Sequence, residues 1–327
     1  MQRPSKIFVT GANGFIGRSL MRRFREQGVA VCGVDLVADQ AWNVIAGNVA
    51  SAGSWQSQAK GCELVIHTAA VVSNSAPAEL YRNVSVGSVR HVINAAIKAE
   101  AHRVVHLSSI AAYGLNFSHD RVETDAISLL SGYPYCDAKA ASEHAALAAH
   151  AAGEMACTII RPGDVYGPGS RPWVLIPLSM MRKNQFFLPA LGRGIFSPVY
   201  IDNLLDGIEA AALSPAAGAG QIYNITDGTQ PTCREFFAHH WQWLGRKGTP
   251  PMLPNMLASP VVAMGAWLLN DVLKQNSEIS VGSLAMLKRQ AGYSIVKAQH
   301  QLGYQPKINL SQGMELTESW LKAEKQI

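Results

Sequence analysis

The chain has 327 residues, 48% of them apolar and only 16% charged, so it can bury a substantial core and is expected to carry broad apolar surfaces. Its formal net charge of +5 comes from scattered Lys and Arg side chains without a long basic run, and this pattern does not favour a nucleic-acid partner. The cysteines are far apart and form no C-x-x-C pair, which argues against a zinc site and a disulfide framework and predicts a reducing, cytoplasmic location.

Short apolar runs rich in Val and Ile alternate with helical patterns in the first half of the chain. The runs lie at residues 6–10, 30–36, 63–69, 103–109 and 156–162. Runs that are apolar on both faces and separated by helices are typical of buried parallel strands in β-α-β units. The sequence therefore predicts an α/β fold, a Rossmann-type doubly wound parallel sheet, over residues 1–162. No signal peptide is expected, because the first run leads straight into a glycine turn.

The alternation loosens after residue 162, which predicts a smaller, interleaved lobe over most of residues 163–327. Residues 197–213 again have the pattern of a strand followed by a helix and are expected to return to the sheet. Further helices are expected at 233–245 and 311–323. The uncharged segment 250–270 is interrupted by two prolines, so it is predicted to pack on something apolar, with at most peripheral membrane contact.

Three glycines lie between the first predicted strand and an amphipathic helix. Gly11, Gly14 and Gly17 follow the spacing G-x-x-G-x-x-G. The first permits a tight exit from the strand, the second lets backbone amides approach a pyrophosphate, and the third allows close packing of helix on strand. The helix N-terminus then faces the anion, so this stretch predicts a dinucleotide site.

Asp35 ends the second predicted strand, 18 residues after Gly17. A carboxylate at this place accepts hydrogen bonds from both adenosine ribose hydroxyls and repels a 2′-phosphate. Residues 33–38 contain no Arg or Lys that could hold such a phosphate. The sequence therefore predicts NAD rather than NADP as the cofactor, and residues 1–162 as the NAD-binding domain.

Two tyrosines, Tyr133 and Tyr135, precede Lys139 in the stretch "SGYPYCDAK". If a helix begins near Pro134, Tyr135 and Lys139 are four residues apart and share one face, whereas Tyr133 lies outside the helix start. The spacing selects Tyr135 as the partner of the lysine. Taken alone the pair is common in helices, so its meaning depends on the cofactor site.

Several motifs occur together in a fixed order. They are "TGANGFIG" (10–17), "HTAA" (67–70), "LSSIAAYG" (107–114), Tyr135-x-x-x-Lys139 and "RPGDVYGPG" (161–169). With them the chain resembles the extended short-chain dehydrogenase/reductase superfamily, of the NAD-dependent epimerase/dehydratase type, over nearly its whole length. The resemblance implies a Rossmann fold, NAD as cofactor and oxidoreductase or epimerase chemistry.

The resemblance implies that Ser109, Tyr135 and Lys139 are the catalytic residues, with Ser108 a weaker candidate for the serine. A tyrosine with a pKa of about 10 is a poor base at neutral pH. The Lys139 ammonium and the positive nicotinamide ring both favour the phenolate, and lowering the pKa by about three units corresponds to roughly 4 kcal/mol. Tyr135 would then take a proton from a substrate hydroxyl while Ser109 holds the oxygen and Lys139 bonds the nicotinamide ribose.

A wider set of cofactor contacts carries over from the resemblance, including small residues that admit the phosphates and ribose. Asn48 stands where relatives often have an Asp at the adenine, and Asn83 is either a cofactor contact or a buried structural residue. The full predicted set is Gly11, Asn13, Gly14, Phe15, Ile16, Gly17, Asp35, Asn48, Val49, His67, Ala69, Ala70, Asn83, Tyr135, Lys139 and Pro162.

The stretch "VYIDNLLDGIEAAA" resembles the 3β-hydroxysteroid and sterol-carboxylate dehydrogenase branch, and the second lobe is rich in apolar residues. An apolar small molecule, for example a steroid or sterol, is therefore the expected substrate. Sugar-nucleotide enzymes grip a diphosphate with an arginine where Phe196 stands here, but nearby Arg193 keeps an NDP-sugar 4-epimerase open. A non-catalytic NAD-binding sensor or assembly protein is the third alternative. Candidate substrate contacts are Tyr133, Asp164, Arg193 and Phe196.

The predicted helix that carries Tyr135 and Lys139 is rich in alanine, which allows close approach of another helix. In the superfamily that this chain resembles, this helix and the one before it commonly build a dimer through a four-helix bundle. A homodimer is therefore expected.

Overall fold

The computed structural model of the chain describes residues 3–73, 76–127, 129–214, 219–258, 260 and 281–327. Its main sheet is parallel throughout, with the strand order β3-β2-β1-β4-β5-β6-β9. The strands are β1 (Lys6–Thr10), β2 (Ala30–Asp35), β3 (Val44–Ala46), β4 (Leu64–His67), β5 (Arg103–Leu107), β6 (Cys157–Pro162) and β9 (Ile222–Ile225). The order reverses between β1 and β4, which puts the ligand-binding crevice of such a sheet at the carboxyl ends of these strands.

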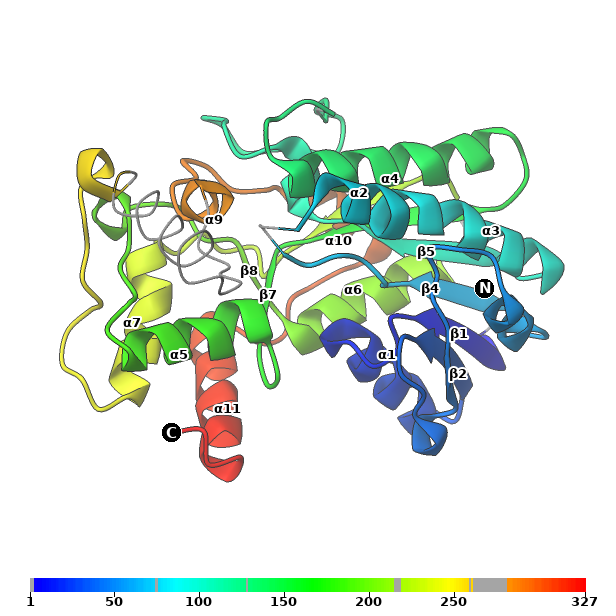
Figure 1. Ribbon diagram of the computed structural model, residues 1–327, viewed down its shortest axis with the longest axis horizontal. Coiled ribbons are helices and arrows are strands. Elements are labelled where there is room, and N and C mark those ends of the chain that lie inside the picture. Colours follow the sequence, from blue (N-terminus) through cyan, green and yellow to red (C-terminus); the bar gives the residue numbers. More distant parts are fainter. Residues whose placement is uncertain (1–2, 74–75, 128, 215–218, 259, 261–280) are drawn as a thin grey trace.

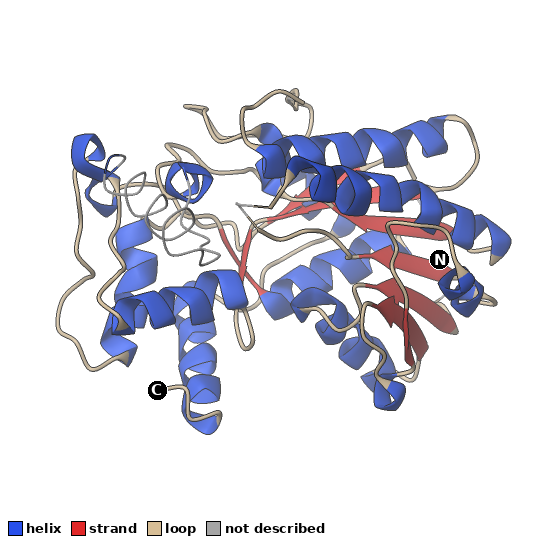
Figure 2. Cartoon of the chain, viewed as in Figure 1, coloured by secondary structure: helices blue, strands red, loops and turns tan. Residues whose placement is uncertain are grey.

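Helices cover both faces of the main sheet, as the two ribbon views show (Figures 1 and 2). Among them, α3 (Ser88–Lys98) and α4 (Pro134–Ala151) pack on one face, and α1 (Phe15–Glu26) and α6 (Ile201–Leu213) pack on the other. The further described helices are α2 (Ala78–Leu80), α5 (Ile176–Arg182), α7 (Cys233–Trp243), α9 (Val281–Met286), α10 (Val296–Leu302) and α11 (Leu310–Ala323), of which α5, α7, α9 and α11 lie in the second lobe (Figure 1). The predicted doubly wound fold is confirmed, and α7 and α11 lie at the two helices expected in the second half of the chain.

The central strand β1 shows why these runs form buried strands. Phe8 packs with residues of α3 and α4 on one face, while Ile7 and Val9 pack with residues of α1 and α6 on the other. All three side chains are fully buried, so a strand that is apolar at every position has a partner on each side. α3 and α4, through which the homodimer is predicted, pack side by side (Figure 1). The dimer itself stays a prediction.

The second lobe is built around an aromatic cluster. Phe196 and Phe236 stack with their ring centroids 3.9 Å apart, and Trp173, Phe237 and His240 surround them. These rings belong to the same core cluster as the residues of β1 that face α1. The two lobes therefore share one continuous core.

Residues 197–213 form a short strand and a helix, as predicted, but only the helix covers the main sheet. The strand β8 (Pro198–Tyr200) pairs with β7 (Asp164–Tyr166) in a separate two-stranded sheet. The helix α6 packs against β5 and β6. The strand that returns to the main sheet is β9, which pairs with β6 and which the sequence pattern did not indicate.

Part of the apolar segment 250–270 lies outside the described residues, namely 259 and 261–270. Its described part includes Met256 and Leu257, which are 87% and 55% exposed. Among the helices that the structure describes, none is both long enough and apolar enough to cross a membrane.

A glycine in α6 sets the distance between this helix and β9. A Cβ added to Gly207 would lie 2.9 Å from side-chain carbons of Ile225. We expect Gly207→Ala to lower the free energy of unfolding by roughly 1–3 kcal/mol through overpacking, although alanine is the better helix former. Urea unfolding followed by circular dichroism measures this. Adding Ile225→Val removes a methyl group at the contact and should restore part of the loss; equal or greater stability of the single variant contradicts the prediction.

Candidate active site

The glycine loop between β1 and α1 has the close contacts that exclude side chains. Gly11 has a φ of 67°, and a Cβ on Gly17 would lie 2.1 Å from the Gly11 carbonyl oxygen. Gly14 is the N-cap of α1 and provides no side-chain cap, so the first-turn amides of Phe15, Ile16 and Gly17 stay available to an anion. The loop therefore fits the pyrophosphate of a dinucleotide.

Asp35 is held at the end of β2 by two backbone amides. Its Oδ2 accepts from the Asn13 amide at 2.8 Å, and its Oδ1 accepts from the Leu36 amide at 2.7 Å. Each oxygen keeps a further lone pair for a ribose hydroxyl. Leu36 and Val37, 72% and 70% exposed, follow this carboxylate and offer an apolar surface beside it.

Ser109 and Tyr135 come together above the ends of β5 and β6. Ser109 follows β5, and its hydroxyl accepts from the Ala111 amide at 3.1 Å. α4 begins at Pro134, as predicted, so Tyr135 stands in its first turn. A hydrogen bond with Ser109 lowers the pKa of Tyr135, but burial outweighs it and raises that pKa to about 12. In the chain by itself the predicted lowering is therefore absent.

Lys139 is buried one turn after Tyr135. Its Nζ donates to the Leu107 carbonyl oxygen at 3.0 Å, and burial lowers its pKa to about 8. The end of β5 thus anchors the ammonium group, next to the serine that follows the same strand. Spacing alone predicted that the lysine shares a helix face with Tyr135, but not that a backbone carbonyl would fix it.

A buried ion pair fastens α4 to the sheet one turn beyond Lys139. Glu143 accepts two hydrogen bonds from Arg161 on β6, from Nε at 2.9 Å and from Nη2 at 2.6 Å, and a third from Ser108. The side chains of the pair are 0% and 2% exposed. Sequence reasoning missed this pair. The available signal was the repeated four-residue spacing Tyr135, Lys139, Glu143 along one helix face, with an arginine inside a buried strand.

The side chain of His67, one of the predicted cofactor contacts, is buried. Its ring is 1% exposed, with Nδ1 2.7 Å from Thr10 Oγ1 and Nε2 3.0 Å from Ser88 Oγ. Burial lowers its pKa to about 3, so the ring is neutral at physiological pH. The histidine supports the neighbouring strand ends from inside, which corrects the expectation that it contacts the cofactor's phosphates.

The other predicted cofactor contacts differ in how deeply their side chains are buried. The side chains of Val49 and Pro162 are buried, the first within the hydrophobic core. Ala69 and Ala70 are partly exposed beside the glycine loop, where a Cβ on Gly11 would lie 2.8 Å from the Ala69 amide nitrogen. Asn48 and Asn83 are exposed. The Asn48 amide oxygen accepts from the Ala50 backbone, and the buried structural role considered for Asn83 is wrong.

The four candidate substrate residues are in four different environments. Tyr133 and Tyr135 pack on an apolar cluster to which the second lobe contributes Ala285 and Met286. Asp164 is 3% exposed and ion-paired with the buried Arg289. Phe196 is completely buried in the aromatic cluster, which corrects the expectation that its side chain contacts substrate.

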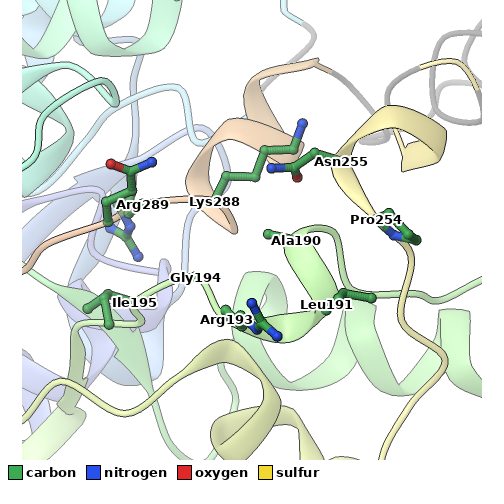
Figure 3. A pocket seen from close by; sticks show the side chains of 10 residues that line it. Ala190, Leu191, Arg193, Gly194, Ile195, Pro254, Asn255, Lys288 and Arg289 are labelled. Carbon is green, nitrogen blue, oxygen red and sulfur yellow. The ribbon is translucent and has the colours of Figure 1, made fainter.

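Arg193 lines a cavity of about 460 Å³ between the segment before β8 and the segment after α9 (Figure 3). Lys288, Arg289 and Asn255 line the same cavity, and the Arg289 guanidinium is ion-paired with Asp164. The cavity is thus lined by cations and a polar amide as well as by apolar residues such as Leu191.

A pyrophosphate loop, a ribose carboxylate and a serine–tyrosine–lysine group at one end of a parallel sheet are the parts that hydride transfer to a dinucleotide requires, which places the chain among the dinucleotide-binding oxidoreductases. A family model described as "NAD dependent epimerase/dehydratase family" matches residues 7–226. The chain belongs to this family, within the extended short-chain dehydrogenases/reductases, and its cofactor is NAD.

Similar proteins include dehydrogenases, ketoreductases and epimerases. A 4-hydroxy-2-methyl-3-oxo-4-farnesyl-3,4-dihydroquinoline-1-oxide ketoreductase of Stigmatella aurantiaca is 24% identical over 323 residues, 95% of each chain. A 3beta-hydroxysteroid-dehydrogenase/decarboxylase of Arabidopsis thaliana is 24% identical over 79% of this chain and 48% of its own. The solved UDP-glucuronic acid 4-epimerase from Bacillus cereus in complex with NAD shares the fold, with a TM-score of 0.77, 21% identity and coverage of 98% and 99%.

A substitution in the Glu143–Arg161 pair tests how strongly this buried ion pair stabilises the protein. Glu143→Ala leaves the Arg161 guanidinium buried without its carboxylate, and we expect a loss of about 3–5 kcal/mol in the free energy of unfolding. Chemical unfolding followed by circular dichroism measures it. The matched control is the double variant Glu143→Leu, Arg161→Met, which removes both charges and should recover most of the loss. A single variant as stable as the parent contradicts the prediction.

Proposed function

We propose that the protein is an NAD-dependent oxidoreductase that interconverts a secondary alcohol and a ketone on an apolar, steroid-like substrate. The observation that carries this proposal is the apolar cluster around the tyrosines, where Ala285 and Met286 of the second lobe reach Tyr133 and Tyr135. The names of the Stigmatella and Arabidopsis relatives, which point to a farnesyl-bearing quinoline oxide and a hydroxysteroid, support it.

Each of the three proposed catalytic residues has a separate role. When bound, NAD supplies the acceptor for a hydride. Ser109 and Tyr135, whose hydroxyls are hydrogen-bonded to each other, are placed to hold one substrate oxygen between them. Tyr135 exchanges the proton with that oxygen. Lys139, anchored on the Leu107 carbonyl, brings a positive charge to the base of the site and stabilises the phenolate.

A second candidate function, NDP-sugar 4-epimerase, is favoured by one observation. Arg193 and Lys288 line a cavity that could take an anionic group. The two functions differ in what turnover leaves behind, because an alcohol–ketone conversion changes the NADH concentration whereas an epimerisation inverts one carbon with no net change. Hydroxysteroids and UDP-sugars assayed in parallel, by NADH absorbance and by product chromatography, separate them.

The two tyrosines provide a matched pair of variants for the proposed chemistry. We expect Tyr135→Phe to lower kcat by about 10²–10⁴-fold, because it removes the group that exchanges the proton. Tyr133→Phe changes the same atoms two residues earlier, outside the helix start, and should act mainly on KM. Steady-state kinetics with NAD and the active alcohol gives both values. An unchanged kcat in Tyr135→Phe would refute the proposed mechanism.

The pKa of Tyr135 predicts different pH responses for the two directions of the reaction. Because burial raises this pKa to about 12, the residue is a phenol at neutral pH. Alcohol oxidation needs the phenolate, so kcat/KM should rise by up to about tenfold per unit between about pH 6 and 7.5. Ketone reduction uses the phenol as the acid and should change by less than about twofold in the same range. Equal slopes in both directions contradict this assignment.

A further inference from the structure

An arginine lies close to the ribose carboxylate, although the sequence around Asp35 contains none. Arg18 is in the first turns of α1, and its Nη2 donates to Asn13 Oδ1 at 2.6 Å. Asn13 is the residue whose backbone amide binds Asp35, and its side-chain amide donates to the Val37 carbonyl at 2.7 Å. Asn13 therefore links the Arg18 guanidinium to the carboxylate of Asp35, the group predicted to bind the adenosine ribose. This cation comes from α1 and not from residues 33–38, which contain no Arg or Lys.

The same Arg18 nitrogen also donates to Asp39 Oδ2 at 2.6 Å. Asp39 is fixed in position, because its backbone amide and carbonyl both bond to the backbone of Val44 at 2.9 Å. The side chains of the pair are only 28% and 33% exposed, which limits screening by solvent. Arg18 is thus committed to a carboxylate that cannot easily move away.

The indole ring of Trp42 packs against the Arg18 guanidinium. The Cζ atom of Arg18 lies 4.7 Å from the centroid of the indole ring, and that of Arg25 lies 4.1 Å from it. The other amino group of Arg18, Nη1, is buried and has no hydrogen-bond acceptor among the described residues. Arg18 therefore retains unused donor capacity, but its position is fixed by Asp39, Asn13 and Trp42.

The preference for NAD over NADP depends on which charged side chains would lie near a 2′-phosphate on the adenosine ribose. An arginine that is free to do so binds a phosphate through two parallel hydrogen bonds. In this chain the phosphate would meet Asp35 and Asp39, both negative, and an arginine whose charge Asp39 already balances. Removing the Asp39 charge would leave the Arg18 guanidinium beside Asn13, the residue whose backbone amide binds Asp35 at the end of β2.

We propose that Asp39 is a specificity-determining residue for the cofactor. By pairing with Arg18 it withholds from a 2′-phosphate the guanidinium that could bind it, and so reinforces the selection of NAD that Asp35 begins. The proposal concerns the adenosine end of the NAD site and is independent of the substrate at Tyr135.

The test measures binding of two non-reacting probes, 2′,5′-ADP with the 2′-phosphate and 5′-ADP without it, by isothermal titration calorimetry. In Asp39→Asn we expect the Kd of 2′,5′-ADP to fall about tenfold, because an arginine–phosphate contact is charge-assisted, while that of 5′-ADP changes by less than about twofold. NADP and NAD titrated in the same way should show the same difference. Because no turnover is needed, a failure of the proposed alcohol chemistry leaves the result readable.

Three control variants assign the effect to the pair. Asp39→Glu keeps the charge and should keep the parent selectivity. Adding Arg18→Gln to Asp39→Asn should cancel the gain, because the freed guanidinium is then missing. Glu318→Gln removes the same charge from an exposed pair with Lys322 on α11 and should change neither Kd.

Arg18→Gln alone tests the proposal from the other side. Since Arg18 is already withheld in the parent, its loss should change the Kd of 2′,5′-ADP by less than about twofold. The proposal is overturned if this variant binds 2′,5′-ADP about tenfold more weakly. It is equally overturned if Asp39→Asn leaves the ratio of the two Kd values unchanged, or if the gain persists without Arg18 or appears in Glu318→Gln.

Discussion

The buried pair of Glu143 and Arg161 holds the helix of the reactive side chains against the sheet. Two hydrogen bonds join a helix residue to a strand residue inside a core where neither charge could remain alone. The pair fixes the rotation of α4 about its axis, and with it the direction in which Tyr135 and Lys139 leave the helix. The geometry of the proposed proton-exchange site therefore depends on an ion pair between Glu143 and Arg161, which have no proposed contact with cofactor or substrate.

Burial sets the charge states around this pair. It lowers the pKa values of Lys139 and His67 and raises that of Tyr135, so each group is pushed toward its neutral form. With a pKa of about 8, Lys139 is still mostly an ammonium ion at neutral pH, so one positive charge stands one helix turn from Tyr135 before NAD binds. The positive nicotinamide ring of NAD then acts in surroundings of low polarity, where one charge has a large effect on a nearby phenol.

Local sequence patterns predicted the features that are determined by residues close to one another in the sequence. The strands β1, β2, β4, β5 and β6 and the helix start at Pro134 follow from periodicity and spacing, whereas the short β3 was not predicted. The choice of Tyr135 over Tyr133 stays a prediction. Contacts between distant segments could not be predicted in this way. Arg18 reaches the end of β2 from α1, and His67 and Phe196 are enclosed by elements far away in sequence, so their environments follow from packing and not from their motifs.

The pairing of β6 with β9 affects how the chain folds during synthesis. β6 pairs with β9 on its outer side, and β9 is encoded more than fifty residues later, after β7, β8 and α6. During synthesis the edge of β6 stays open until β9 has left the ribosome, and the N-terminal part of the chain cannot complete its sheet before then. An unpaired strand edge is a site of wrong association between chains. The nascent chain therefore exposes this strand edge for an interval that a fold with consecutive strands would not have.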